Sequence, residues 1–572
     1  MRHGMSRLLL IAGSLATVAA AACGPRVEPA TMVVRNGKIV TADEGRPEAQ
    51  AMAIRGDTIV ALGTNEEIAP YVGDTTEVID LNGLLAVPGF IEGHGHFTGV
   101  GQARMNLNLM NVANWDEVVQ MVADAVARAQ PGDWIVGRGW HQEKWDRMPE
   151  PNIEGFPTHD SLSKVSPANP VLLTHASGHA SFANAKAMEL AGVTRATPNP
   201  PGGEVLKDRR GNPIGIFRET ASGLIGRART AAREGMTDAE REAEARKIIQ
   251  LANDEALSKG VTSFQDAGSS FETVDLFKKV VDEGQMGVRL WVMLRTSNER
   301  LAESLDTYRM IGYGNNHLTV RAIKVSIDGA LGPRGAWLLE PYSDLPSSTG
   351  LNTTPVESVR ETAKLAAAHG FQLCVHAIGD RANRETLNIF EETFRTNPGL
   401  TGLRWRVEHA QHINAADIPR FGQLDVIASM QGIHCTSDAP YVVARLGPER
   451  AEGGAYVWQK LMKSGAVVSN GTDAPVEDVS PVASYYATVS RKLKNGSVFY
   501  GDQRMSRLEA LRSYTIQAAY AAFEENVKGS LTPGKLADVT VLSKDIMTVP
   551  EDEIPTAEVV YTIVGGRVAY KK

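Results

Sequence analysis

The sequence has few cysteines and aromatic residues and no excess of basic residues. Three cysteines among 572 residues cannot form a disulfide framework. Lys and Arg total 59 against 67 Asp and Glu, a net charge of −8, so no nucleic-acid partner is expected. Beyond the N-terminus no apolar run is long enough for a membrane helix. The hydrophobic fraction of 43% and the charged fraction of 22% are those of a globular chain and exclude disorder, collagen and coiled coil.

The N-terminus has the pattern of an export signal. Two arginines precede an apolar run over 8–22, which is too short to cross a bilayer and ends in small residues before Cys23. Residues 1–22 are therefore predicted to be a signal peptide. A small residue followed by cysteine resembles a bacterial lipobox, so lipid on Cys23 would attach the protein to a membrane; the alternative is cleavage without a lipid. The predicted location is the periplasm, or the membrane as an anchored lipoprotein.

Short strands at both ends of the chain predict one composite β-sandwich. Asn36-Gly37 lies between two short apolar runs and is typical of a two-residue hairpin. Further hairpins are predicted around Gly56 and around Gly565-Gly566. Because such ribbons cannot bury a core alone, residues 27–85 and 528–572 are expected to fold together.

The middle of the chain alternates apolar, β-rich runs with helical stretches. This alternation favours a parallel sheet, and eight runs match the strand count of a (β/α)8, TIM-like barrel, so the expected fold class is α/β with the barrel in residues 86–527. The eight runs are 84–91, 261–264, 288–294, 318–325, 371–375, 403–407, 426–430 and 466–469.

The interval between the first and second runs is too long for a plain crossover. It contains strand-like segments of its own, and it is followed by a capping box at Thr237 and Glu240 that begins a helix ending at Gly260. Residues 100–235 are therefore predicted to be an inserted subdomain. Segments that follow a barrel strand lie on the catalytic face, so the insert is expected to form a lid over the barrel mouth.

Candidate metal ligands stand at the ends of five of the eight runs. His94 and His96 are two residues apart on a strand, so both imidazoles point to the same side. Lys324 lies among apolar residues, where a buried charge is costly unless it meets a carboxylate or is chemically changed. The other candidates are His376, His409 and Asp473. Parallel barrel strands would bring all six groups to one mouth.

These segments resemble the amidohydrolase superfamily, and within it the YtcJ-like branch, close to N-substituted formamide deformylases. The resemblance rests on residues 87–96, the strand around Lys324, and the segments 376–380, 408–410, 471–473 and 531–538. It implies one metal held by His94, His96 and Asp473. It implies a second metal held by His376 and His409, with Lys324, carboxylated by carbon dioxide, as the bridge. The nitrogen and oxygen ligands suit zinc; a one-metal site that uses only some of them is the alternative.

The expected chemistry is hydrolysis of a carbon–nitrogen bond in a non-peptide, small-molecule amide. A metal lowers the pKa of bound water from about 15.7 toward about 7, which gives a metal-bound hydroxide at neutral pH. Asp473 is placed to act as general base and then general acid. The alternatives are a deaminase or lactonase on the same barrel, or a non-catalytic binding lipoprotein.

Several residues carry weaker predictions. His434 could contact substrate and stabilise the oxyanion, or be a loop histidine. Arg334 and Arg381 could bind a substrate carboxylate, although surface roles are the alternative. His179 in the insert is interpreted as packing or as a pocket wall. Glu408 is expected to point away from the barrel interior, because neighbouring strand residues alternate.

Overall fold

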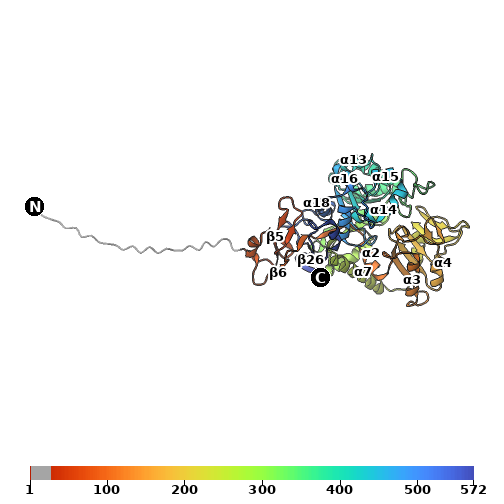
Figure 1. The fold of residues 1–572 in the computed structure, drawn as a ribbon, viewed down its shortest axis with the longest axis horizontal. Coiled ribbons are helices and arrows are strands. Elements are labelled where there is room, and N and C mark those ends of the chain that lie inside the picture. Colours follow the sequence, from red (N-terminus) through yellow and green to blue (C-terminus); the bar gives the residue numbers. More distant parts are fainter. Residues whose placement is uncertain (2–26) are drawn as a thin grey trace.

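The computed structural model describes Met1 and residues 27–572, so the predicted signal peptide and Cys23 lie outside the described residues apart from Met1. The molecule has three parts (Figure 1). A pair of sheets from the two chain ends lies at one end of the view, the insert lies at the other, and the barrel lies between them. No helix in the described residues is long and apolar enough to cross a membrane.

Eight parallel strands form the barrel and follow one another around it in chain order. Their bounds are β8 Phe90–Gly95, β17 Val261–Ser269, β18 Arg289–Leu294, β20 Leu318–Ser326, β21 Gln372–Ala377, β22 Arg406–His409, β23 Ile427–Gln431 and β24 Val468–Gly471. Just beyond the strands, the amide of Asp473 donates to the carbonyl of His94, and the amide of His96 donates to that of Ala474, both at 2.7 Å. The predicted α/β barrel is confirmed.

Two glycines bring β8 and β24 together at this seam. A Cβ on Gly93 would lie 2.3 Å from the carbonyl oxygen of Asn470, and one on Gly471 would lie 2.5 Å from the amide nitrogen of His94. Side chains at either position would push the two strands apart. The close approach places His94 beside Asp473 at the barrel mouth.

Helices surround the barrel strands. Their bounds are α2 Phe97–Met105, α7 Asp238–Ser258, α8 Phe271–Asp282, α9 Asn298–Tyr308, α10 Tyr313–Asn316, α11 Val356–His369, α12 Asp380–Thr396, α13 Ile418–Gln423, α14 Gly432–Leu446, α15 Pro448–Gly454, α16 Trp458–Lys463, α17 Pro481–Ser490, α18 Arg507–Ser513 and α19 Ile516–Ala521. The capping box of Thr237 and Glu240 is present at the start of α7, as predicted. A short strand, β19 Met310–Gly312, pairs antiparallel with β20.

The two chain ends form a β-sandwich. One sheet has the order β5-β4-β1-β6 and the other β27-β26-β25-β7-β2-β3. Their bounds are β1 Met32–Arg35, β2 Lys38–Val40, β3 Glu48–Ala49, β4 Ala51–Arg55, β5 Thr58–Gly63, β6 Glu77–Asp80, β7 Leu85–Pro88, β25 Val539–Leu542, β26 Val559–Val564 and β27 Arg567–Lys571, with the short helix α1 Asn65–Ile68. Apolar side chains of both ends, among them Ile54 and Val541, share one buried core.

Two local predictions in this region were wrong. Strand β1 pairs with β4 and β6, whereas β2 pairs with β3 and β7, so Asn36-Gly37 connects two sheets instead of closing a hairpin. Burial of both strands against distant partners overrides the local turn preference. The first apolar run divides at Gly89, where β7 ends in the sandwich and β8 begins in the barrel. The hairpins at Gly56 and at Gly565-Gly566 are confirmed.

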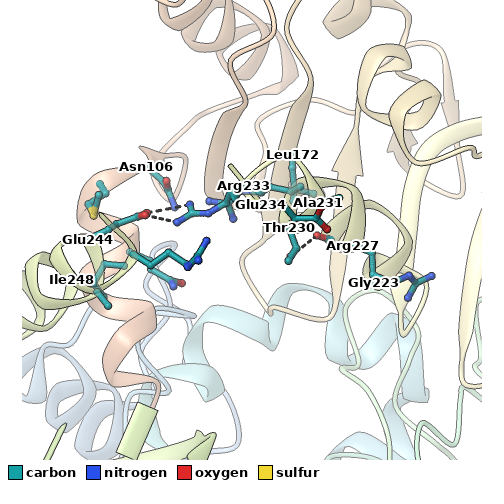
Figure 2. Close-up of a pocket in the computed structure, with 16 residues that line it drawn as sticks. Asn106, Leu172, Gly223, Arg227, Thr230, Ala231, Arg233, Glu234, Glu244 and Ile248 are labelled. Carbon is teal, nitrogen blue, oxygen red and sulfur yellow. Dashed lines mark hydrogen bonds and ion pairs between the residues drawn. The ribbon is translucent and has the colours of Figure 1, made fainter. Parts of the chain in front are cut away.

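The insert has a sheet of its own, with the strand order β15-β16-β14-β13-β10-β9. Its elements are β9 Leu107–Asn108, α3 Trp115–Val126, β10 Ile135–Trp140, β11 Asn152–Ile153, β12 Phe156–Pro157, α4 Asp160–Val165, β13 Val171–His175, β14 Ala180–Ala183, α5 Ala185–Leu190, β15 Gly203–Lys207, β16 Pro213–Glu219 and α6 Ser222–Ala231. Where it meets the barrel, a cavity of about 690 Å³ lies between α2, α6 and α7. Figure 2 shows Arg233 paired with Glu244 in this cavity, and none of the predicted metal ligands lines it.

Candidate metal centre

The carboxyl ends of the barrel strands carry the predicted ligands to one place. A cavity of about 410 Å³, here called the mouth cavity, opens above them. Its wall includes five of the six candidates, namely His96, Lys324, His376, His409 and Asp473. The sixth, His94, is fully buried and lies in contact with these residues.

Contacts link all six side chains. The Nε2 atom of His94 lies 3.3 Å from Nζ of Lys324 and 3.7 Å from Oδ1 of Asp473. The Nε2 atom of His96 lies 3.2 Å from the same oxygen. The ring centroid of His409 lies 4.6 Å from that of His94 and 4.4 Å from that of His376. The structure therefore gathers side chains from five barrel strands around one small space.

The protonation states favour metal binding. Burial, with the charge of Lys324, lowers the pKa of His94 to about 4, and burial holds the pKa of His376 and of His409 well below the usual range. Burial alone would raise the pKa of Asp473, but the hydrogen bond from His96 and the neighbouring imidazoles hold it well below its usual range. Neutral imidazoles and an ionised carboxylate are the forms that bind a metal.

The donor atoms also fit a metal. Among the described residues, Nε2 of His376 and Nε2 of His434 are buried without a hydrogen-bond partner. Two groups of three side chains bring their donor atoms within 4.8 Å of one another. One group is His94, His96 and Asp473, and the other is His409, His434 and Asp473. Nitrogen and oxygen donors in such sets suit a divalent ion such as zinc.

Lys324 is a buried amine at the floor of the mouth cavity. Its side chain is 3% exposed, and in the described part of the chain it forms no ion pair with a carboxylate. Burial lowers its pKa to about 8. Of the two outcomes expected for a lysine at this position, pairing with a carboxylate is therefore not found among the described residues.

Glu408 holds His94 from inside the barrel, contrary to the sequence expectation. Its carboxylate contacts Nδ1 of His94 and accepts from Arg406 at 3.1 Å. The expectation failed because Arg406 and Glu408 both face the interior, and the strand ends at His409, whose φ of 75° turns its side chain to the mouth as well. Nδ1 of His409 lies 2.8 Å from Oε1 of Gln431, which fixes that ring in the same way.

The insert and the strand ends add polar groups to the mouth cavity. Arg138, His179 and Glu219 come from the insert, and Arg295 and Asp328 follow barrel strands. Nδ1 of His179 lies 2.7 Å from Oε2 of Glu219, and its ring centroid lies 4.8 Å from that of His376. The insert therefore forms part of the wall around the predicted ligands.

A protein-family profile matches most of the chain. The profile of the Amidohydrolase family matches residues 77–570, which include the barrel and all six candidate ligands. The chain belongs to the amidohydrolase family. Its predicted resemblance to that superfamily is thereby confirmed.

Individual proteins agree with this assignment. The amidohydrolase is 34% identical to the protein LONG AFTER FAR-RED 3 of Arabidopsis thaliana, over 95% of this chain and 92% of that protein. It is 27% identical to the N-substituted formamide deformylase of Arthrobacter pascens, over 95% and 98% of the two chains. A solved structure of an uncharacterised metal-dependent hydrolase from Pyrococcus horikoshii OT3 superposes with a TM-score of 0.70 at 26% identity, covering 91% of this chain and 99% of that one.

Of three other candidate residues of this amidohydrolase, His434 lies close to the mouth cavity, whereas Arg334 and Arg381 do not line it. His434, near the start of α14, stacks at 6.4 Å on His409 and lines a chamber of about 40 Å³ beside the mouth cavity. Arg334 is paired with Asp344 at 3.0 Å, and Arg381 lies over the ring of Trp337. Neither arginine lines the mouth cavity or the smaller chamber.

Some site residues of the amidohydrolase were missed by sequence reasoning. Asp328 accepts the amides of Ile378, Gly379 and Trp337, and its position four residues after Lys324 was an available signal. Arg138 and Glu219 had no such signal. They reach the cavity only because the insert docks on the barrel, which no local pattern predicts.

Proposed function

We propose that this amidohydrolase cleaves the carbon–nitrogen bond of a non-peptide amide in a small molecule. The observation that carries the proposal is the meeting of His94, His96, Lys324, His376, His409 and Asp473 at one barrel mouth. The similarity to an N-substituted formamide deformylase over nearly the whole chain supports an amide substrate.

We infer that two zinc ions are the resident metals. His94, His96 and Asp473 would hold one, His376 and His409 the other, and Lys324, carboxylated on Nζ, would serve both. A carbamate offers two anionic oxygens where the buried amine offers none. Bound zinc would supply a Lewis acid that lowers the pKa of water and polarises the amide carbonyl.

The side chains of the protein perform the proton transfers in this proposal. Asp473 takes a proton from the attacking water on a carboxylate oxygen and returns it to the leaving nitrogen. His434, with its unpartnered Nε2, donates to the carbonyl oxygen as negative charge develops there. Glu408 and Gln431 fix the orientation of His94 and His409 throughout.

Metal content and hydrolysis test this function together. Purified protein should contain about two zinc ions per chain, hydrolyse members of a panel of N-formyl and N-acyl amides, lose activity with a chelator and regain it with zinc. Lys324→Ala should lose at least one zinc ion and about 1,000-fold or more in kcat/KM. The exposed Lys364→Ala is the matched control. Unchanged zinc content and rate in Lys324→Ala would overturn the bridging role.

We also propose that the protein is exported and anchored through lipid on Cys23. The support is the N-terminal sequence pattern alone. Wild-type protein expressed in a Gram-negative bacterium should fractionate with membranes, whereas Cys23→Ser should appear in the soluble periplasmic extract. The buried Cys435→Ser serves as the control. Recovery of both the wild type and Cys23→Ser in the cytosol would contradict export.

A further inference from the structure

The acidic groups of the mouth cavity all have partners. Glu219 pairs with His179, and Asp328 accepts three backbone amides. Asp473 lies 3.2 Å from Nε2 of His96 and belongs to the candidate metal ligands. No carboxylate in the wall is therefore left to neutralise a further cation.

Arg295 is a cation without a counterion. It follows β18, its stem lies against Gly268, and its Nη2 donates to Oγ of Ser326 at 3.1 Å. Ser326 is two residues beyond Lys324 on β20. Among the described residues no carboxylate forms an ion pair with Arg295, and the guanidinium stays open to the cavity. Although the residue is exposed, partial desolvation by the surrounding atoms lowers its pKa.

Arg138 provides a second cation on the same wall. Its Nε donates to the carbonyl of Pro475 at 3.2 Å and its Nη2 to the carbonyl of Ala176 at 3.1 Å, so the guanidinium is fixed by two neutral groups. No carboxylate pairs with it in the described part of the chain. Burial lowers its pKa to about 10, although the charge of Asp473 opposes this.

The two arginines stand on the same arc of the mouth. Arg138 lies over the end of β24 and Arg295 at the end of β18, with β8, which ends just before His96, and β17 between these strands. Arg295 also contacts Ser326 at the end of β20. The Glu219–His179 pair and Asp328 lie beside β20 and β21. The two arginines of the cavity wall therefore lie on either side of the strand that ends just before His96.

We propose that the substrate is an anionic amide whose carboxylate is bound by Arg295 and Arg138. Both guanidinium groups line the cavity without a carboxylate partner among the described residues, and their planar geometry matches a carboxylate. A carboxylate at this wall lies beside the ligands at which the amide is cleaved. The inference rests on the proposed amide hydrolysis and names its substrate class.

Matched acid and carboxamide pairs test the inference on zinc-loaded, full-length protein. N-formylphenylalanine and its carboxamide differ only at a carboxylate on the amine side, and N-benzylsuccinamic acid and its carboxamide only at one on the acyl side. The wild type should prefer the acid of at least one pair by about ten- to a hundredfold in kcat/KM. Arg295→Gln and Arg138→Gln should each lower that acid-to-amide ratio by about tenfold or more.

The controls separate this role from others. Arg360→Gln changes an arginine paired on the surface of α11 and should keep the wild-type ratio. A lowered ratio in Arg381→Gln but not in Arg295→Gln would overturn the inference. The inference would also be overturned if Arg295→Gln lowered kcat/KM equally for acid and carboxamide and contained less zinc. Arg295 would then support the metal site at Lys324 and not bind the substrate.

If no compound of the panel is hydrolysed, the inference can still be tested by measuring the binding of the same acid and carboxamide pairs. A lack of hydrolysis would defeat the proposed function but not the anion site. By calorimetry the acid of at least one pair should bind the wild type about tenfold more tightly than its carboxamide, and Arg295→Gln should remove the difference. Equal Kd values for acid and carboxamide in the wild type would overturn the inference.

Discussion

At the residue scale, the candidate metal centre depends on buried side chains that hold the predicted ligands in position. Glu408 contacts Nδ1 of His94 and is itself held by Arg406. All three side chains are fully buried. A carboxylate on the outer nitrogen of a histidine fixes the ring and raises its basicity toward a metal.

Glu408→Gln should therefore weaken zinc binding by about 10- to 100-fold while leaving the ligands in place. Competition against a coloured chelator measures the zinc Kd. The exposed Glu558→Gln should behave as wild type. Because the variant also removes the partner of buried Arg406, the melting temperature of the zinc-free protein should be compared as well. An unchanged zinc Kd would exclude the role given to Glu408.

The meeting of His94, His96 and Asp473 could be predicted because each of these residues stands at the end of a barrel strand. Parallel strands of a barrel end at one rim. The prediction failed for Glu408, since simple alternation does not foresee the turn at His409. Arg138 could not be predicted, because it reaches the cavity only through docking of the insert.

At the scale of elements, the barrel seam depends on two glycines. A Cβ on Gly93 would meet the backbone of Asn470, whereas one on Gly453 in α15 would meet nothing within 4 Å. Backbone cannot move aside as a flexible side chain can. The seam therefore has no room for a side chain at Gly93, whereas the open position of Gly453 has room for one.

Gly93→Ala should lower the free energy of unfolding by about 1–3 kcal/mol, because the overpacked seam must open. Gly453→Ala should leave it unchanged or raise it by up to about 1 kcal/mol, because alanine is the better helix former. Chemical denaturation of both variants measures the difference. Equal midpoints for the two would show that the seam tolerates the extra atom.

The elements themselves were largely predictable from apolar runs, because a buried parallel strand is apolar on both faces. The seven barrel strands from β17 to β24 overlap the expected runs, whereas the short strand β19 matches none of them. The Asn36-Gly37 turn was misread for a physical reason. Its local preference is worth little beside the burial of β1 and β2 in two different sheets, and those partners lie far away in the sequence.

At the scale of the whole molecule, one buried ion pair joins the barrel to the sandwich. Arg289 begins β18, and its Nε and Nη2 lie 2.8 and 3.0 Å from the two carboxylate oxygens of Asp538, just before β25. The amide of Gly565 also donates to this carboxylate at 2.9 Å. Both charged side chains are at most 5% exposed.

Asp538→Asn should lower the free energy of unfolding at pH 7 by about 3–5 kcal/mol, because it leaves Arg289 buried and unpaired. Burial alone would raise the pKa of Asp538, but Arg289 holds it below the ordinary value. The contribution is therefore complete above the unfolded pKa of about 3.9 and is lost as pH falls through the lower folded pKa. The gap between wild type and variant should shrink below about pH 4. Asp306→Asn, an exposed carboxylate, is the control. If the difference in free energy of unfolding between the wild type and Asp538→Asn did not change with pH, the stabilising role of the ionised Asp538 would be contradicted.

The position of β7 between β2 and β25 has a consequence for biosynthesis. While the ribosome is still making the barrel, β7 can pair with β2 but not with β25. One edge of β7 therefore stays unpaired until the last strands of the chain are made. The amino-terminal half of the sandwich therefore cannot mature during translation, and closure comes as a late, long-range event after residue 539 has emerged. A premature stop codon shortly before that point would release a chain with an open sheet edge, ready to pair with another copy.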